Sequence, residues 1–84
     1  MGRQVSGNTA ALAMALDVWA KSRERAIIDL SRQAASFANY GCEDDAAYCR
    51  FAARSLAVKA IHERARAVGL RATLPAFQER TLSP

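Results

Sequence analysis

The chain has 84 residues, of which 51% are hydrophobic and 24% charged, with a formal net charge of +4. A chain this short forms one domain at most, and it is marginally stable unless it packs very regularly or associates. Alanine dominates the hydrophobic fraction, and only four glycines and two prolines interrupt the chain. This composition is typical of helices, because alanine loses no side-chain entropy in one. No run of about eighteen apolar residues is present, so no membrane span is expected.

The N-terminal segment has two interpretations. Its sequence, MGRQVSGN, lacks the apolar core of a signal peptide, so we expect a cytoplasmic protein. Gly2 and Ser6 also match the short pattern for N-myristoylation, which chance often produces. We favour an ordinary terminus, because Arg3 is the only basic residue nearby and a single acyl chain anchors weakly.

A first long helix is predicted over residues 8–40. Ser6, Asn8 and Thr9 are candidate N-cap residues, since a short polar side chain there accepts a hydrogen bond from the first turn. No proline or glycine follows until Gly41, which is the expected left-handed residue past a helix C-terminus.

A second helix is predicted over residues 44–68, after a corner at 41–44. Three consecutive acids follow Cys42, and negative side chains stabilise the start of a helix because they interact with the positive end of its dipole. Gly69 is expected to end the helix. A short connection makes two helices antiparallel neighbours. We therefore predict a single all-α domain: an antiparallel hairpin of two long helices, with a short C-terminal segment at 70–84.

Both helices carry a series of residues at alternating spacings of three and four, which places them on one face for helix packing. The first series is Thr9, Leu12, Leu16, Trp19, Arg23, Ala26, Leu30, Gln33, Phe37 and Tyr40. The second is Ala47, Phe51, Arg54, Val58, Ile61, Ala65 and Val68. We predict that these two series form the interior of the hairpin, with large residues opposite small ones.

Further apolar faces predict association. The second helix has another series of mostly small residues, roughly 150° around its axis from the first: Ala46, Cys49, Ala53, Leu56, Ala60, Glu63 and Ala67. A hairpin cannot bury two faces of each helix, so we predict a homodimer in the form of a four-helix bundle. The candidate dimer-interface residues are Met14, Val18, Ala53, Leu56 and Ala60. The alternative is that alanine is merely common in helices and its exposed face means little.

Arg23 and Arg54 stand near the centres of the predicted interior series. In the structural interpretation, each extends sideways toward solvent or pairs with Asp29, Glu24 or Glu63 across the bundle, and a polar residue at such a position can fix the register. In the functional interpretation, each anchors an acidic partner. We favour the structural interpretation, and we expect Trp19 to lie in the core.

Metal, cofactor and catalytic sites are not expected. Cys42 and Cys49 would lie about 10.5 Å apart along a helix axis, too far for a disulfide, and His62 is the only other soft metal ligand. His62 also has no second catalytic group beside it in the pattern, and no glycine-rich phosphate loop occurs. We therefore expect a protein without enzyme activity.

By this exclusion, and from the surplus apolar faces, we predict a non-catalytic protein-binding module: a small regulator or inhibitor that docks on a larger protein. The candidate partner-binding residues are Arg23, Arg54, Arg64, Arg66, Leu74 and Phe77. The alternative is a nucleic-acid-associated regulator, because residues 50–71 hold six basic residues against Glu63 alone. We rank it second, since these basic residues point around much of the helix instead of forming one stripe.

Overall fold

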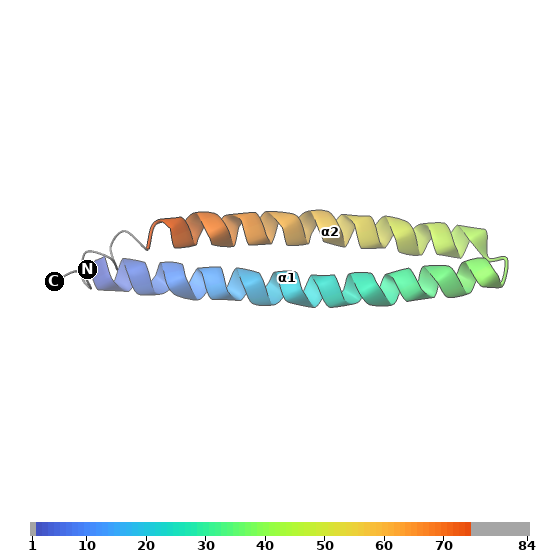
Figure 1. Ribbon diagram of the computed structural model, residues 1–84, viewed down its shortest axis with the longest axis horizontal. Coiled ribbons are helices and arrows are strands. Elements are labelled where there is room, and N and C mark those ends of the chain that lie inside the picture. The colour runs from blue at the N-terminus through green and yellow to red at the C-terminus, as the bar shows by residue number, and fades with distance from the viewer. Residues whose placement is uncertain (1, 75–84) are drawn as a thin grey trace.

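The computed structural model describes residues 2–74, with side chains from residue 7 onward. They form two helices, α1 (Gly2–Asn39) and α2 (Glu43–Ala72), which lie antiparallel and side by side (Figure 1). The predicted all-α hairpin is confirmed. The radius of gyration is 18.8 Å, against about 12 Å for a compact domain of this length, so the molecule is a rod. Neither helix is long and apolar enough to cross a membrane.

Gly41 makes the corner between the helices. The amide of Cys42 donates to the carbonyl of Phe37 at 2.8 Å, and the amide of Gly41 donates to that of Ala38 at 3.1 Å. This is the Schellman arrangement, which satisfies the last carbonyls of a helix and requires a left-handed residue. Gly41 supplies it with a φ of 78°, which glycine adopts without a Cβ clash. The predicted role of Gly41 is confirmed.

The start of α1 differs from the prediction. The helix begins at Gly2, so Ser6, Asn8 and Thr9 lie within it instead of capping it.

The end of α2 also differs, because the helix continues through Gly69 to Ala72. One glycine inside a helix costs only about 1 kcal/mol, and the next residue, Leu70, packs against the cluster of buried residues that includes Leu16. Thr73 caps this end by donating its hydroxyl to the carbonyl of Leu70 at 2.7 Å. The remainder of the predicted C-terminal segment, residues 75–84, lies outside the described residues.

The helix contact uses a different face of α2 from the predicted one. Every seventh residue is a buried alanine, at 0–9% exposure: Ala46, Ala53, Ala60 and Ala67. Cys49 is buried beside them. We call the full series Ala46, Cys49, Ala53, Leu56, Ala60, Glu63 and Ala67 the alanine seam. The sequence assigned it to a dimer interface, and that assignment of Ala53, Leu56 and Ala60 is wrong, because α1 of the same chain covers them.

The series predicted for the interior of α2 lies on the outside instead. All seven residues are exposed, and we call them the outer stripe: Ala47, Phe51, Arg54, Val58, Ile61, Ala65 and Val68. On α1 the prediction is partly right, because Leu16 is buried beside Ala13 and Ala20. Trp19, however, is 49% exposed and does not form the expected core.

Small side chains decide which faces meet. Of the nine buried residues in the described part, seven are alanines, joined by Leu16 and Cys49. Alanine lets two helices approach closely, so that backbone and Cβ atoms gain dispersion contacts along the whole length. No large side chain is fully buried among residues 7–74. The hairpin therefore gains its stability from regular close packing and leaves most of its bulky apolar side chains in water.

Candidate protein-binding surface

The outer stripe is the most prominent apolar surface of α2. Phe51, Val58, Ile61 and Val68 are 55–66% exposed. They follow one another at spacings of seven, three and seven residues, so they share one face of the helix. Ala47 and Ala65, both exposed, provide small positions in the same stripe. This pattern is that of a helix seam without a partner helix.

A second exposed apolar group lies on α1. Met14 and Val18, two of the predicted dimer-interface residues, are each 64% exposed. They border a shallow groove of about 440 Å³, which Asp17, Lys21, Arg64 and Arg71 also line. In this groove α1 supplies both apolar and charged side chains, and α2 supplies two arginines.

Arg23 makes an ion pair inside the helix contact. Its Nε donates to Oε1 of Glu63 at 2.7 Å. Glu63 belongs to the alanine seam and its side chain is only 14% exposed. The hydrogen bond raises the pKa of Arg23 above its ordinary value. The structural interpretation of Arg23 is supported, because a polar pair at a seam position fixes the register of the two helices.

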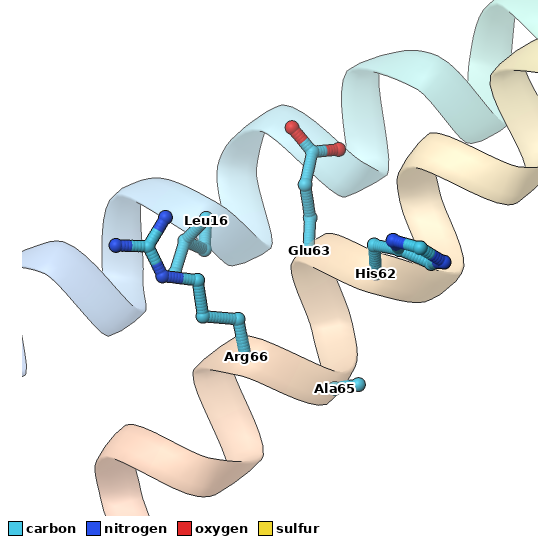
Figure 2. A pocket seen from close by; sticks show the side chains of 5 residues that line it. All are labelled: Leu16, His62, Glu63, Ala65 and Arg66. Atoms are coloured by element: carbon cyan, nitrogen blue, oxygen red, sulfur yellow. The ribbon is translucent and has the colours of Figure 1, made fainter.

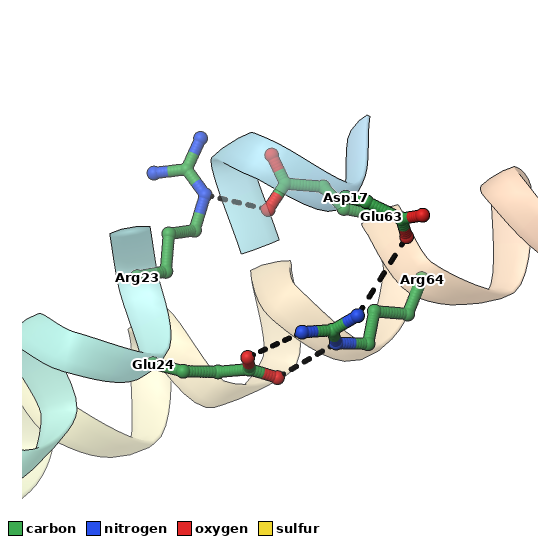
Figure 3. A network of polar contacts seen from close by, with 5 residues as sticks. All are labelled: Asp17, Arg23, Glu24, Glu63 and Arg64. Carbon is green, nitrogen blue, oxygen red and sulfur yellow. Dashed lines mark hydrogen bonds and ion pairs between the residues drawn. The ribbon is translucent and has the colours of Figure 1, made fainter. Parts of the chain in front are cut away.

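Arg64 is held by α1 in the same region of the hairpin (Figure 3). It donates two hydrogen bonds to Glu24, at 2.6 and 2.8 Å, and lies 3.6 Å from Asp17. This bidentate pair lowers the pKa of the Glu24 carboxyl and raises that of Arg64. Arg71 also pairs with Asp17. Arg64 was predicted as a partner-binding residue, but here its charge is used within the hairpin.

Arg54 and Arg66 remain available at the surface. Both are exposed, and neither takes part in an ion pair within residues 7–74. Arg66 borders a shallow groove of about 560 Å³ that Leu16, His62, Glu63 and Ala65 also line (Figure 2). The groove is open, and it is lined by Leu16 of α1 and by four residues of α2.

The remaining candidates lie near the end of the described chain. Leu74 is half-buried, and its amide donates to the carbonyl of Arg71 at 3.0 Å. Phe77 lies outside the described residues. Leu70, which the sequence placed in the tail, belongs to α2 and packs, partly buried, against the core cluster that contains Leu16.

No group of three or more His, Cys, Asp or Glu side chains among the described residues is placed to hold a metal ion. Cys42 is exposed and Cys49 is buried in the alanine seam, and both are free thiols. His62 lies at the rim of the open groove beside Glu63 and Arg66.

Sequence reasoning named Glu24 as a possible partner of Arg23 or Arg54, but it did not foresee the pair with Arg64, and it missed Asp17. The signal was present in the spacing: Asp17 and Glu24 lie seven residues apart and share one face of α1, as Arg64 and Arg71 do on α2. It became usable only once the correct face of α2 was known. The chain gives no significant match to any family model, curated protein or solved structure, so its function is argued from this surface.

Proposed function

We propose that the protein is a non-catalytic protein-binding module, a small helical regulator or inhibitor that docks on a larger protein through the outer stripe of α2. The observation that carries this proposal is the exposure of Phe51, Val58, Ile61 and Val68 at heptad spacing, on a face that α1 does not cover. Apolar faces of this kind mark association sites, and an amphipathic helix that meets an apolar groove or helix is a common mode of recognition.

The energetics favour a partner on this face. Fully burying a valine, isoleucine or phenylalanine side chain stabilises by about 1.5–3 kcal/mol. Scaled by the exposed fraction of the four side chains, a covering helix would gain roughly 4–7 kcal/mol from them. The alanine seam offers much less per residue, because each alanine buries one methyl group. The outer stripe therefore retains an apolar free energy of several kcal/mol that is available for association.

Homodimerisation is a second proposal, on the other helix. The exposed pair Met14 and Val18 supports it, whereas Ala53 and Ala60 are now assigned to the hairpin itself. Light scattering at micromolar concentration tests it: a Val18→Glu variant should shift a dimer mass toward that of the monomer. A wild-type chain with a monomer mass would remove this proposal.

A nucleic-acid-associated regulator remains the competing class. Arg50, Arg54, Lys59 and Arg66 form no ion pair among residues 7–74, which supports it. Against it, Arg64 and Arg71 are engaged by carboxylates of α1. Phosphate binding loses orders of magnitude in affinity between about 50 and 200 mM salt, so gel shifts across that range separate the two classes.

A cytoplasmic location is part of the proposal, and the two free thiols support it, since thiols stay reduced inside most cells.

Site-specific photocrosslinking in the native host tests the docking proposal. A photoreactive residue at position 58, within the outer stripe, should form an adduct with one protein of defined mass. The adduct should disappear when Ile61→Glu places a charge in the same stripe. The matched control is the same photoreactive residue at position 25 of α1, which is also exposed and should give no such adduct. Equal labelling at both positions, or an adduct with nucleic acid alone, would contradict docking through this stripe.

A further inference from the structure

The charged residues around the outer stripe indicate which kind of partner it can bind. In a helix seam, the rows on either side of the apolar residues set the choice of partner. One flanking row of the outer stripe contains Arg50, Ala57 and Arg64, and the other contains Tyr48, Ser55 and His62. Together with the stripe itself over residues 47–68, these rows hold three arginines and a histidine but no carboxylate.

Two of these arginines have no partner in the hairpin. Arg64 turns toward α1 and is bound by Glu24. Arg50 and Arg54 are exposed and make no ion pair within residues 7–74. Arg54 lies inside the stripe, between Phe51 and Val58, where any covering helix would remove its charge from water. A desolvated arginine is tolerated only when a carboxylate pairs with it.

A second copy of α2 does not satisfy this requirement. If two outer stripes paired in parallel, Arg54 would face its own copy in the seam. If they paired antiparallel about Val58, the large and small residues would match, with Phe51 opposite Ala65. Arg50 would then lie opposite Arg64 of the other copy, and Arg54 opposite Ile61. Both arrangements bring like charges together or leave Arg54 unpaired, which disfavours self-association through this face.

We infer that the outer stripe binds an amphipathic helix of a partner protein that carries carboxylates in the rows flanking its apolar seam. This inference rests on the proposed docking function and adds the chemistry of the partner. The partner helix would span about three heptads, or roughly 33 Å. Its apolar residues cover Phe51, Val58, Ile61 and Val68, and its acidic side chains reach Arg50 and Arg54.

Synthetic helical peptides test the charge of the occupant directly. Three peptides of three heptads share leucine and isoleucine in their seam and identical outer residues. Their flanking rows differ only in being all glutamate, all glutamine or all lysine. Binding of each labelled peptide to the full chain is measured by fluorescence anisotropy at about 50 mM and 200 mM salt. We expect the glutamate peptide to bind at least about tenfold more tightly than the lysine peptide at the lower salt, with the glutamine peptide between them.

Charge reversal separates a local contact from the net charge of the protein. The variant with Arg50→Glu and Arg54→Glu should reverse the preference toward the lysine peptide. The matched control carries Arg25→Glu and Arg32→Glu, two exposed arginines of α1 that lie outside all the ion pairs found in residues 7–74. It has the same net charge as the first variant and should keep the preference for glutamate. Circular dichroism checks that both variants retain the helical content of the wild type.

Each other outcome has a definite meaning. Equal binding of all three peptides overturns the acidic partner but leaves docking through the stripe in place. Preference for the lysine peptide, or the same loss in both double variants, also overturns the inference. Failure of all three to bind contradicts both the inference and the docking function. A duplex oligonucleotide that binds through Arg50 and Arg54 more tightly than the glutamate peptide would assign the face to nucleic acid instead.

Discussion

The two faces of α2 differ in a way that reverses the usual expectation for a buried surface. The alanine seam, which has little apolar area per residue, is covered by α1, while the outer stripe keeps Phe51, Val58, Ile61 and Val68 in water. Hydrophobicity alone would bury the outer stripe. The alanine seam is buried because small residues allow close packing of two helices and because Glu63 meets Arg23 there. One face therefore builds the fold, and the other is the face that we propose binds a partner.

The largest expected effect comes from enlarging a seam alanine. Ala60 is 4% exposed, so Ala60→Leu should force the helices apart and lower the free energy of unfolding by about 1–3 kcal/mol. Ala65→Leu makes the same chemical change on the outer stripe and should alter it by less than about 0.5 kcal/mol. Urea denaturation followed by circular dichroism measures both. If Ala65→Leu were the more damaging variant, the assignment of inner and outer faces would be reversed.

Substitution of Gly41 tests whether the corner is needed to bring the alanine seam against α1. Because Gly41 has a φ of 78°, Gly41→Ala forces a Cβ into the left-handed region and should destabilise the hairpin by about 1–2 kcal/mol. Gly69→Ala is the control, since a Cβ there meets nothing within 4 Å. It should stabilise α2 by about 0.5–1 kcal/mol. Thermal unfolding of the two variants should move in opposite directions; movement in the same direction would contradict the geometry of the corner.

Arg23 and Arg54 allow the covered and uncovered faces to be compared through charged side chains, because Arg23 lies in the helix contact and Arg54 lies in the outer stripe. Arg23→Ala leaves the mostly buried carboxylate of Glu63 in the seam without its partner, so the unfolding midpoint should fall. Arg54→Ala removes an exposed side chain that has no ion pair among residues 7–74 and should leave the midpoint unchanged. We expect partner binding to respond in the opposite order. An equal loss of stability in both variants would mean that Arg54 supports the hairpin.

The smallest effect concerns pH. Arg64 holds the pKa of Glu24 below its ordinary value of 4.5, so folding favours the charged carboxylate. The stabilisation is complete above the pKa of the unfolded chain and is lost as the pH falls through the lower pKa of the folded state. Glu24→Gln should therefore make the stability less dependent on pH below about 4.5. Asp29→Asn, at an exposed position outside the ion pairs, should leave that dependence intact, and acid titrations followed by circular dichroism compare the two.

The sequence by itself determined the two helices and the corner. Alanine content, the absence of breakers before Gly41 and the acidic start of α2 all act locally, within a few residues, so they are readable without knowledge of the fold. The heptad spacing also revealed that α2 has two faces able to pack against another helix. The ends were less certain: α2 runs past Gly69 because the contact of Leu70 with the core offsets a weak helix residue.

Only the tertiary structure decided which face of α2 meets α1. The spacings of the alanine seam and the outer stripe are equivalent, so periodicity cannot rank them. The choice depends on how closely two particular surfaces approach, and on the register that joins Arg23 to Glu63 and Arg64 to Glu24. Those are pairwise properties of residues about forty positions apart. They also decide the candidate site, because the face that the hairpin leaves uncovered is the one that we propose binds a partner.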